Sequence, residues 1–232
     1  MSTSRQATTA SNCQWFADNG LYEEMQSKIE LYRRIKCIVE AEIKGSDRLL
    51  DIGNGGFFNF DTDLATAVTA VDLFLKDGPG PAPNTFMKQG SFLDLPFAEG
   101  SFDVVMQQNV LHHVTGCSVA ENFANMKRCV SEMYRCLAPG GKALLIESTV
   151  NPFFNAFECL AYRFVLAVKK RGHQVTFQYT PAQVAHAAKQ AGFQIQEICF
   201  IPRGRWILQF GHKWPAFLTP ARPIKAILRK PT

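Results

Sequence analysis

The chain lacks the features that mark secreted and membrane-spanning proteins. No apolar run reaches 18 residues, and residues 1–12 are polar and rich in Ser and Thr, without the apolar core of a signal peptide. The seven cysteines are odd in number, form no Cys-x-x-Cys pair and lie in several cases within apolar stretches. This pattern indicates reduced, buried thiols. We therefore expect a cytoplasmic protein with no metal site and no stable membrane insertion.

A patch of concentrated positive charge is also missing. The net charge is +5, but Lys and Arg are scattered until the C-terminus, whereas nucleic-acid-binding proteins usually gather them on one surface. We expect no nucleic-acid partner, and we interpret the excess as ordinary solubility charge. With 232 residues and 47% hydrophobic content, the chain has enough apolar material for a single globular domain.

The order of predicted elements indicates an α/β fold. Residues 1–12 are expected to be disordered, and residues 13–232 to form one domain. Apolar residues at helical spacing predict one or two helices within 21–44. Strands are expected at 48–52, 67–73, 85–88, 102–106, 142–146, 193–201 and 223–229, and helices at 119–137, 151–171 and from Thr180-Pro181 to Gly192. This alternation predicts a mostly parallel sheet with helices on both faces.

Polar side chains follow the predicted strands at their carboxyl ends, where ligands bind in such sheets. They are Asp51, Asp72, Ser91, Gln107 and Glu147. A glycine turn, Gly53-Asn54-Gly55-Gly56, comes directly after the first strand and lets the backbone approach a nucleotide-like ligand. An Asp before the first glycine favours a ligand that carries hydrogen-bond donors and positive charge. Asp72 lies 21 residues after Asp51, near the spacing at which nucleotide binders place a ribose-binding carboxylate.

Six motifs in order resemble the class I S-adenosylmethionine-dependent methyltransferases, closest to the small-molecule and quinone-type (type 11-like) group. They are Leu50-Asp51-Ile52-Gly53-Asn54-Gly55, Val71-Asp72, Gly90-Ser91 through Leu95-Pro96-Phe97, Ser101-Phe102-Asp103-Val104-Val105, Val110-Leu111-His112-His113-Val114 and Leu137-Ala138-Pro139-Gly140-Gly141. The resemblance implies a Rossmann-like, seven-stranded sheet. It divides the domain into an N-terminal helical cap (13–45), a cofactor-binding half (46–150), a small helical lid (151–180) and C-terminal strands with a loop (181–232).

The resemblance also implies a role for each matched residue toward S-adenosyl-L-methionine. Asp51 would accept from the methionine amino group, and Gly53, Asn54 and Gly55 would let the backbone approach the cofactor. Asp72 would hold the ribose hydroxyls with Leu73 against the adenine face, Ser91 and Phe92 would meet the adenine edge, and the Gln107 region would supply a carbonyl. Two positions depart from the family pattern: Phe57 stands where a third glycine is expected, and Ser91 where an Asp is common. We expect Phe57 and Phe58 to line a pocket.

Three residues are candidates for acid–base chemistry, namely His112, His113 and Glu147. A base is needed only when the methyl acceptor arrives protonated, and imidazole titrates near neutral pH. On a helix that begins near Asn109, His112 is expected to point away from the buried side and into the cleft, with His113 at its border. Structural roles explain the same residues: His113 as a hydrogen-bonded residue, His112 as a pocket wall and Glu147 as a cap of the following turn.

The expected activity is methyl transfer to a small apolar or aromatic metabolite, with oxygen favoured over nitrogen and carbon as the acceptor atom. The aromatic set Trp15, Tyr22, Tyr32, Phe153 and Phe157 suggests this acceptor class, although core packing explains aromatics equally well. Basic and aromatic residues alternate within 203–222 (Arg203, Arg205, Trp206, Phe210, His212, Lys213, Trp214) and suit an anionic tail or peripheral membrane contact, although we favour a solvated loop. We expect a monomer or homodimer. A catalytically silent methyltransferase-like binding subunit and an NAD(P)-linked oxidoreductase remain as alternatives.

Overall fold

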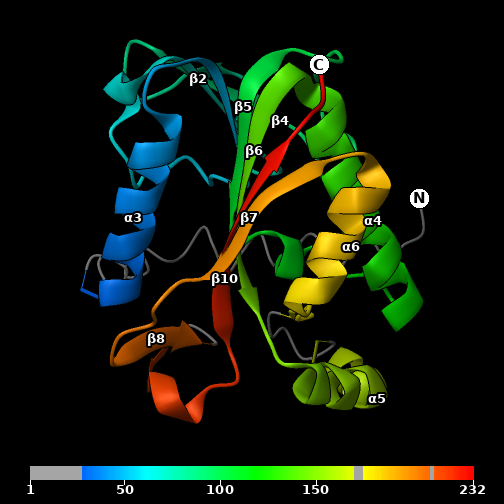
Figure 1. Cartoon of the computed structure of the whole chain (residues 1–232). Helices are drawn as coiled ribbons and strands as arrows, with labels where there is room; N and C mark the ends of the chain where they lie inside the picture. Colours follow the sequence, from blue (N-terminus) through cyan, green and yellow to red (C-terminus); the bar gives the residue numbers. More distant parts are fainter. Residues whose placement is uncertain (1–27, 170–174, 210–211) are drawn as a thin grey trace.

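A twisted eight-stranded sheet forms the centre of the protein (Figure 1). The computed structural model describes residues 28–169, 175–209 and 212–232. The strand order is β3-β4-β2-β1-β5-β6-β10-β7. Five neighbouring strands run parallel: β4 (Thr85–Gln89), β2 (Ala65–Asp72), β1 (Ser46–Ile52), β5 (Phe102–Gln108) and β6 (Leu137–Thr149). β10 (Arg222–Arg229) pairs antiparallel with both β6 and β7 (Gln194–Phe200), and β3 (Gly78–Pro79) pairs antiparallel with β4.

Helices cover both faces of the sheet (Figure 1). On one face, α3 (Glu30–Ile43) buries Leu31, Ile35, Val39 and Ile43, whose four-residue spacing places them on one side of the helix. On the other face lie α4 (Val119–Cys136) and α6 (Pro181–Ala191). α6 begins with a reciprocal capping box between Thr180 and Gln183 and ends at the left-handed Gly192, as its sequence predicts. The predicted α/β class, with helices on both faces, is confirmed.

The structure corrects several details of the prediction. The main sheet has eight strands and not seven, because Gly78–Pro79 adds a two-residue edge strand within the expected loop. β5 continues to Gln108, two residues past its expected end. The expected loop at 203–222 contains a hairpin of β8 (Trp206–Gln209) and β9 (His212–Pro215), followed by a 3₁₀ turn, η3 (Ala216–Leu218). The predictions for residues 1–12 and for the start of the first helix near 21 lie outside the described residues.

The connection between β1 and β2 contains no α-helix. Residues 53–61 form turns, and the only helical piece before β2 is the 3₁₀ turn η1 (Thr62–Leu64), capped by Asp61 Oδ1, which accepts from Asp63 N–H at 3.1 Å. Parallel strands are usually joined by a helix, and the third glycine of a dinucleotide-type turn allows that helix to pack closely on the strand. Since there is no helix to pack here, the chain tolerates Phe57 at this position.

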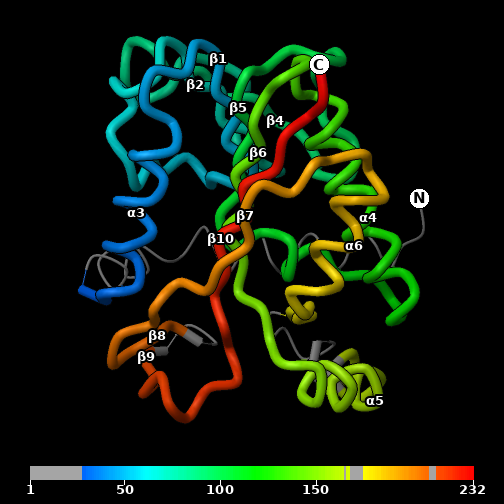
Figure 2. Tube along the Cα trace, viewed as in Figure 1, coloured from blue at the N-terminus to red at the C-terminus, as the bar shows by residue number. Residues whose placement is uncertain are grey.

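The carboxyl ends of the parallel strands face one end of the molecule. β6 runs toward this end and continues into α5 (Pro152–Lys169), as the continuous trace in Figure 2 shows. The β8–β9 hairpin and η3 lie at the same end, below the sheet in Figure 1. None of the helices in the described ranges combines the length and the apolar character that a membrane crossing requires.

Candidate functional site

The glycine turn after β1 is held in shape by the side chain of Asn54. Its Nδ2 donates to Asp51 Oδ2 at 2.6 Å and to the Phe57 carbonyl at 2.9 Å, while its Oδ1 accepts from Gly56 N–H at 2.9 Å. Gly53, Gly55 and Gly56 all have positive φ, which disfavours any residue with a Cβ. The sequence identified Asn54 as a position of backbone approach, but its side chain is what organises the turn.

Asp72 joins the end of β2 to the same turn. Its Oδ2 accepts from Gly55 N–H at 3.0 Å, and its Oδ1 accepts from Phe74 N–H at 3.3 Å. Each carboxylate oxygen retains a further lone pair for a ligand hydroxyl. Leu73, beside it, is 41% exposed and can contact a flat ligand. The structure therefore brings Asp51, Asp72 and the glycine turn together, as the strand ends predicted.

The two carboxylates have no cationic partner among the residues that the structure describes. Asp51 is 2% exposed, and burial raises its pKa to about 7, with the neighbouring Asp72 charge adding to the shift and the Asn54 hydrogen bond opposing it. Burial likewise raises the pKa of Asp72, against the hydrogen bonds that it accepts. A buried, unpaired carboxylate is costly. This site therefore favours a ligand that brings positive charge and hydrogen-bond donors.

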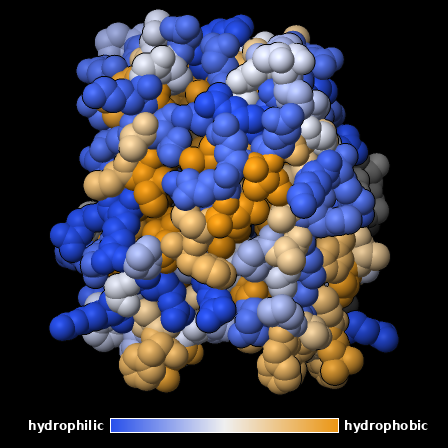
Figure 3. All heavy atoms as spheres, in the orientation of Figure 1, coloured by the Kyte–Doolittle hydropathy of each residue, from blue (hydrophilic) through white to orange (hydrophobic). Residues whose placement is uncertain are grey.

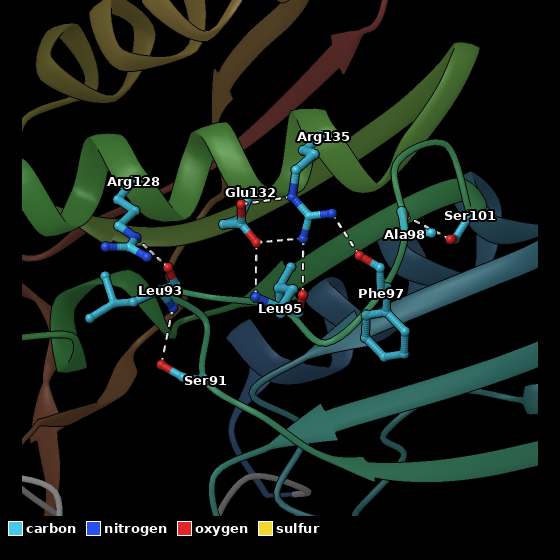
Figure 4. Close-up of polar contacts among 9 residues, drawn as sticks. All are labelled: Ser91, Leu93, Leu95, Phe97, Ala98, Ser101, Arg128, Glu132 and Arg135. Carbon is cyan, nitrogen blue, oxygen red and sulfur yellow. Dashed lines mark hydrogen bonds and ion pairs between the residues drawn. The ribbon is translucent and has the colours of Figure 1, made fainter.

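Polar side chains of α4 hold the segment after β4 in place (Figure 4). Glu132 Oε2 accepts from Leu95 N–H at 2.8 Å, and Arg135 donates to the carbonyls of Leu95 (2.9 Å) and Phe97 (2.6 Å) while pairing with Glu132. Arg128 donates to the Leu93 carbonyl. Ser91 Oγ accepts from Leu93 N–H at 3.2 Å within its own turn, and Phe92 is buried in the core. The segment predicted to meet the adenine edge is thus preformed.

Gln107 is a structural residue at the end of β5. Its side chain donates to the Ile146 carbonyl at 3.0 Å and accepts from Val110 N–H at 2.9 Å, and the whole residue is buried between β1 and β6, so Gln107 itself offers no group to a ligand. The next segment packs on the glycine turn, since a Cβ on Gly53 would lie 2.4 Å from Val110 Cγ2. Asn109 has a φ of 58°, a left-handed conformation that nothing in the sequence indicated.

His112 and Glu147 form a buried pair beside this turn. His112 Nδ1 is in hydrogen-bond contact with Glu147 Oε1, and Glu147 also accepts from Leu111 N–H at 2.9 Å and Ser148 N–H at 2.8 Å. His112 Nε2 has no hydrogen-bond partner in the described part of the chain. The expected helix from Asn109 is wrong, since η2 (Leu111–His113) is a single 3₁₀ turn, and His112 lies on its buried side at 8% exposure. The pairing itself was not predicted.

Two further titratable groups surround the pair. His113 stacks at 4.1 Å between ring centroids on His112, and desolvation lowers its pKa well below the usual value, with the His112 charge adding to the effect. Glu158, on α5, was not singled out by the sequence. Burial raises its pKa to about 7, against a 2.9 Å hydrogen bond from Gln178 N–H and the charge of His112. Among the described residues, no cluster of three His, Cys, Asp or Glu could hold a metal ion.

The aromatic residues that face inward differ from those that the sequence associated with the acceptor. Tyr162, Phe177 and Tyr179 are buried, and Phe177 N–H donates to the His112 carbonyl at 2.9 Å. Phe153 and Phe157, which the sequence associated with the acceptor class, are 85% and 60% exposed. Phe58 packs edge-on against Phe60 beside the core under α3, whereas Phe57 is 43% exposed. Trp15 and Tyr22 lie outside the described residues.

The comparisons with known proteins agree with this architecture. Residues 50–145 match a family model described as a methyltransferase domain. An uncharacterized methyltransferase of Mycolicibacterium gilvum (strain PYR-GCK) is 35% identical over 113 residues, which is 45% of this chain and 41% of that protein. The chain therefore spans less than half the length of the curated relative that it matches.

Two solved structures show the same fold at low identity. The 1,6-didemethyltoxoflavin-N1-methyltransferase of Burkholderia thailandensis, with bound S-adenosylhomocysteine, aligns over all of this chain and 92% of its own with a TM-score of 0.62 and 14% identity. A SAM-dependent methyltransferase of Methanosarcina mazei aligns over 84% and 97% of the two chains with a TM-score of 0.60 and 16% identity. Residues 50–145 are thus similar to a methyltransferase domain, and the chain shares its fold with these two methyltransferases.

Proposed function

We propose that the protein transfers a methyl group from S-adenosylmethionine to a hydroxyl oxygen of a small, apolar or aromatic metabolite. One observation carries the proposal. Asp51 and Asp72, two carboxylates without cationic partners in the described part of the chain, meet at the glycine turn. Val110 packs against this turn and holds the segment that bears His112 beside it. The turn suits a cationic nucleotide-like ligand, and the imidazole beside it suits an acceptor that must lose a proton.

The residues of the turn fit this cofactor. Asp51 would accept from the methionine ammonium, which is the positive group that its buried carboxylate lacks. Asp72 would accept from the ribose hydroxyls with the lone pairs left by Gly55 and Phe74. Gly55 faces open space, since no atom lies within 4 Å of the position that a Cβ would occupy, so a ligand can approach its backbone. When bound, the cofactor supplies an activated methyl group on a sulfonium.

His112 would act as the general base. When an acceptor hydroxyl attacks the methyl group that the cofactor would supply, its proton would pass to His112 Nε2. Glu147 accepts from Nδ1–H, which fixes the tautomer that leaves Nε2 free and stabilises the imidazolium that forms. A hydroxyl acceptor needs this role, whereas a carboxylate or thiolate acceptor, which arrives without the proton, does not.

The alternative is a binding subunit of the same fold without turnover. The helix-free connection after β1 favours it, since the cofactor turn departs there from the usual strand–turn–helix arrangement. A nicotinamide-linked oxidoreductase is disfavoured because Asp51 stands at the place where a pyrophosphate would bring negative charge.

Calorimetry with S-adenosylhomocysteine and turnover assays separate these functions. We expect binding by the wild type, a strong loss of binding in Asp72→Ala, and methylation of apolar phenols or alcohols from labelled S-adenosylmethionine. We expect His112→Asn to lower kcat by about 10²–10⁴-fold with cofactor affinity retained, and Glu147→Gln to lower it less. Cofactor binding without turnover on any acceptor would support the silent subunit, and no binding would end both proposals.

A further inference from the structure

The α5 helix presents its apolar side to the outside of the protein. Phe153, Phe157, Leu160 and Phe164 recur at helical spacing and are 85%, 60%, 82% and 77% exposed. They form a continuous stripe, hereafter the α5 stripe. Large exposed hydrophobic side chains that adjoin one another mark a binding surface, whereas isolated ones are ordinary.

Three polar side chains of α5, those of Asn155, Glu158 and Tyr162, face inward, the reverse of an ordinary surface helix. Asn155 Nδ2 donates to the Gln178 carbonyl at 2.7 Å, and Glu158 Oε2 accepts from Gln178 N–H at 2.9 Å. Tyr162 is buried and donates to the Gly116 carbonyl at 2.9 Å. These contacts fix the rotation of the helix about its axis, so the outward direction of the α5 stripe is built into the fold.

A second apolar projection lies at the same end of the molecule. Phe217 and Leu218 of η3 are 81% and 60% exposed, and Trp206 and Trp214 of the hairpin beside them are about two-fifths exposed. Figure 3 shows two hydrophobic projections at the lower end, at the positions that η3 and α5 occupy in Figure 1. Tryptophan with neighbouring cations is typical of side chains placed at a lipid headgroup boundary.

The C-terminal third of the chain carries the excess of positive charge, and part of it lies beside the apolar projections. Residues 151–232 contain twelve Lys and Arg but two Asp and Glu, whereas residues 1–150 contain thirteen and eighteen. The two acids do not add unpaired negative charge to the apolar projections, because Glu158 faces inward and Glu197 is paired with Lys225 at 2.7 Å. Arg163 on α5 and Arg205 and Lys213 at the hairpin are exposed beside the apolar side chains.

We propose that the α5 stripe and the η3–hairpin projection together dock the protein onto an anionic lipid surface. The apolar side chains enter the headgroup boundary and the flanking cations contact lipid phosphates, as for interfacial helices. The carboxyl ends of the parallel strands, where Asp51, Asp72 and His112 lie, then face the membrane. Docking does not depend on methyl transfer, and its test has a separate readout.

Sedimentation of the full chain with vesicles tests the proposal. We expect binding to vesicles of phosphatidylcholine and phosphatidylglycerol, little binding to phosphatidylcholine alone, and release by raised salt. Leu160→Ser/Phe164→Ser should lower the bound fraction at least tenfold, and Arg163→Gln/Lys213→Gln should weaken binding to the anionic vesicles alone. Phe86→Ser is the matched control, since Phe86 is 53% exposed but lies on β4.

Three results would overturn the proposal. They are no binding of the wild type to anionic vesicles, equal binding of wild type and the stripe variant, or equal loss in the Phe86→Ser control. Circular dichroism and melting curves establish that each variant is folded. Light scattering adds a further outcome that would overturn it: a wild-type dimer that becomes monomeric in the stripe variant, without vesicle binding, would identify the α5 stripe as an interface between two copies of this chain.

Discussion

Replacing Asp51 by Asn tests the electrostatics of the cofactor turn most directly. In the folded protein the pKa of Asp51 is about 7, against 3.8 for an Asp carboxyl group in its ordinary state. The folded state therefore holds a proton between about pH 4 and 7 that the unfolded state has lost, and stability falls as pH rises through this window. A shift of about three pH units corresponds to about 4 kcal/mol that the ionised, buried carboxylate costs above pH 7.

Asp51→Asn removes this cost and retains a side-chain oxygen to accept from Asn54. At pH 8 we expect the variant to be more stable than the wild type by up to about 4 kcal/mol, or about 10 °C in Tm for a chain of this size. At pH 4 the two proteins should melt together. Calorimetric melting from pH 4 to 8 measures the difference, and parallel Tm curves for the two proteins would refute the reasoning.

Asp103→Asn is the matched control with the opposite sign. Asp103 accepts from Arg48 at 2.7 and 2.9 Å, and this hydrogen bond lowers the pKa of its carboxyl group. Its contribution is present at neutral pH and is lost as pH falls through its lowered pKa. Asp103→Asn should therefore lower Tm at pH 8, where Asp51→Asn raises it.

The same ionisation should appear in cofactor binding. A ligand ammonium favours the ionised form of Asp51, so binding of S-adenosylhomocysteine at pH 7 should release about half a proton, and its affinity should fall by up to about tenfold per pH unit below 7. Calorimetry in buffers of different ionisation enthalpy counts the protons. Equal wild-type affinity at pH 6 and 8 would contradict the assignment of Asp51 to the ammonium.

Two further predictions concern how the turn and the adenine-side segment are supported. Gly53→Ala and Gly55→Ala share the cost of a positive φ, about 1–2 kcal/mol, but only Gly53→Ala brings a Cβ against Val110. Urea unfolding should therefore show a larger loss of unfolding free energy for Gly53→Ala, and equal losses would contradict the contact. Glu132→Ala leaves Leu95 N–H without its acceptor and should cost about 1–3 kcal/mol in unfolding free energy while weakening S-adenosylhomocysteine binding; unchanged affinity would show that the segment needs no support from α4.

The strand ends could be predicted because they follow from short-range pattern. Apolar runs that end in an acid identified Asp51 and Asp72 as strand ends, and the topology rules for parallel sheets predicted that both lie at one edge of the sheet. The His112–Glu147 pair could not be predicted in this way. The two residues are 35 positions apart, and their contact depends on β5 running two residues further and on a single 3₁₀ turn placing the imidazole inward.

The orientation of α5 could not be predicted from the sequence either. Aromatic and aliphatic residues of α5 occur on all sides of the helix, so their spacing in the sequence does not distinguish its outer side from its inner side. Hydrogen bonds that join Asn155 and Glu158 to Gln178 decide it, and they connect segments at least twenty residues apart. Phe153 and Phe157, which the sequence associated with an apolar or aromatic acceptor, face outward for this reason.

The helix-free connection between β1 and β2 also affects how the protein folds and fluctuates. A crossover helix protects its own amides, but within the described part of the chain residues 54–60 make one backbone–backbone hydrogen bond, from Phe57 N–H to the Asn54 carbonyl at 3.3 Å. Their amides should exchange with solvent far faster than those of β1 and β2. A cofactor that binds the ordered turn would slow this exchange, and at about a hundred times its Kd would stabilise the whole fold by about 2.7 kcal/mol. The ligand would then supply the local order that a helix provides in related sheets.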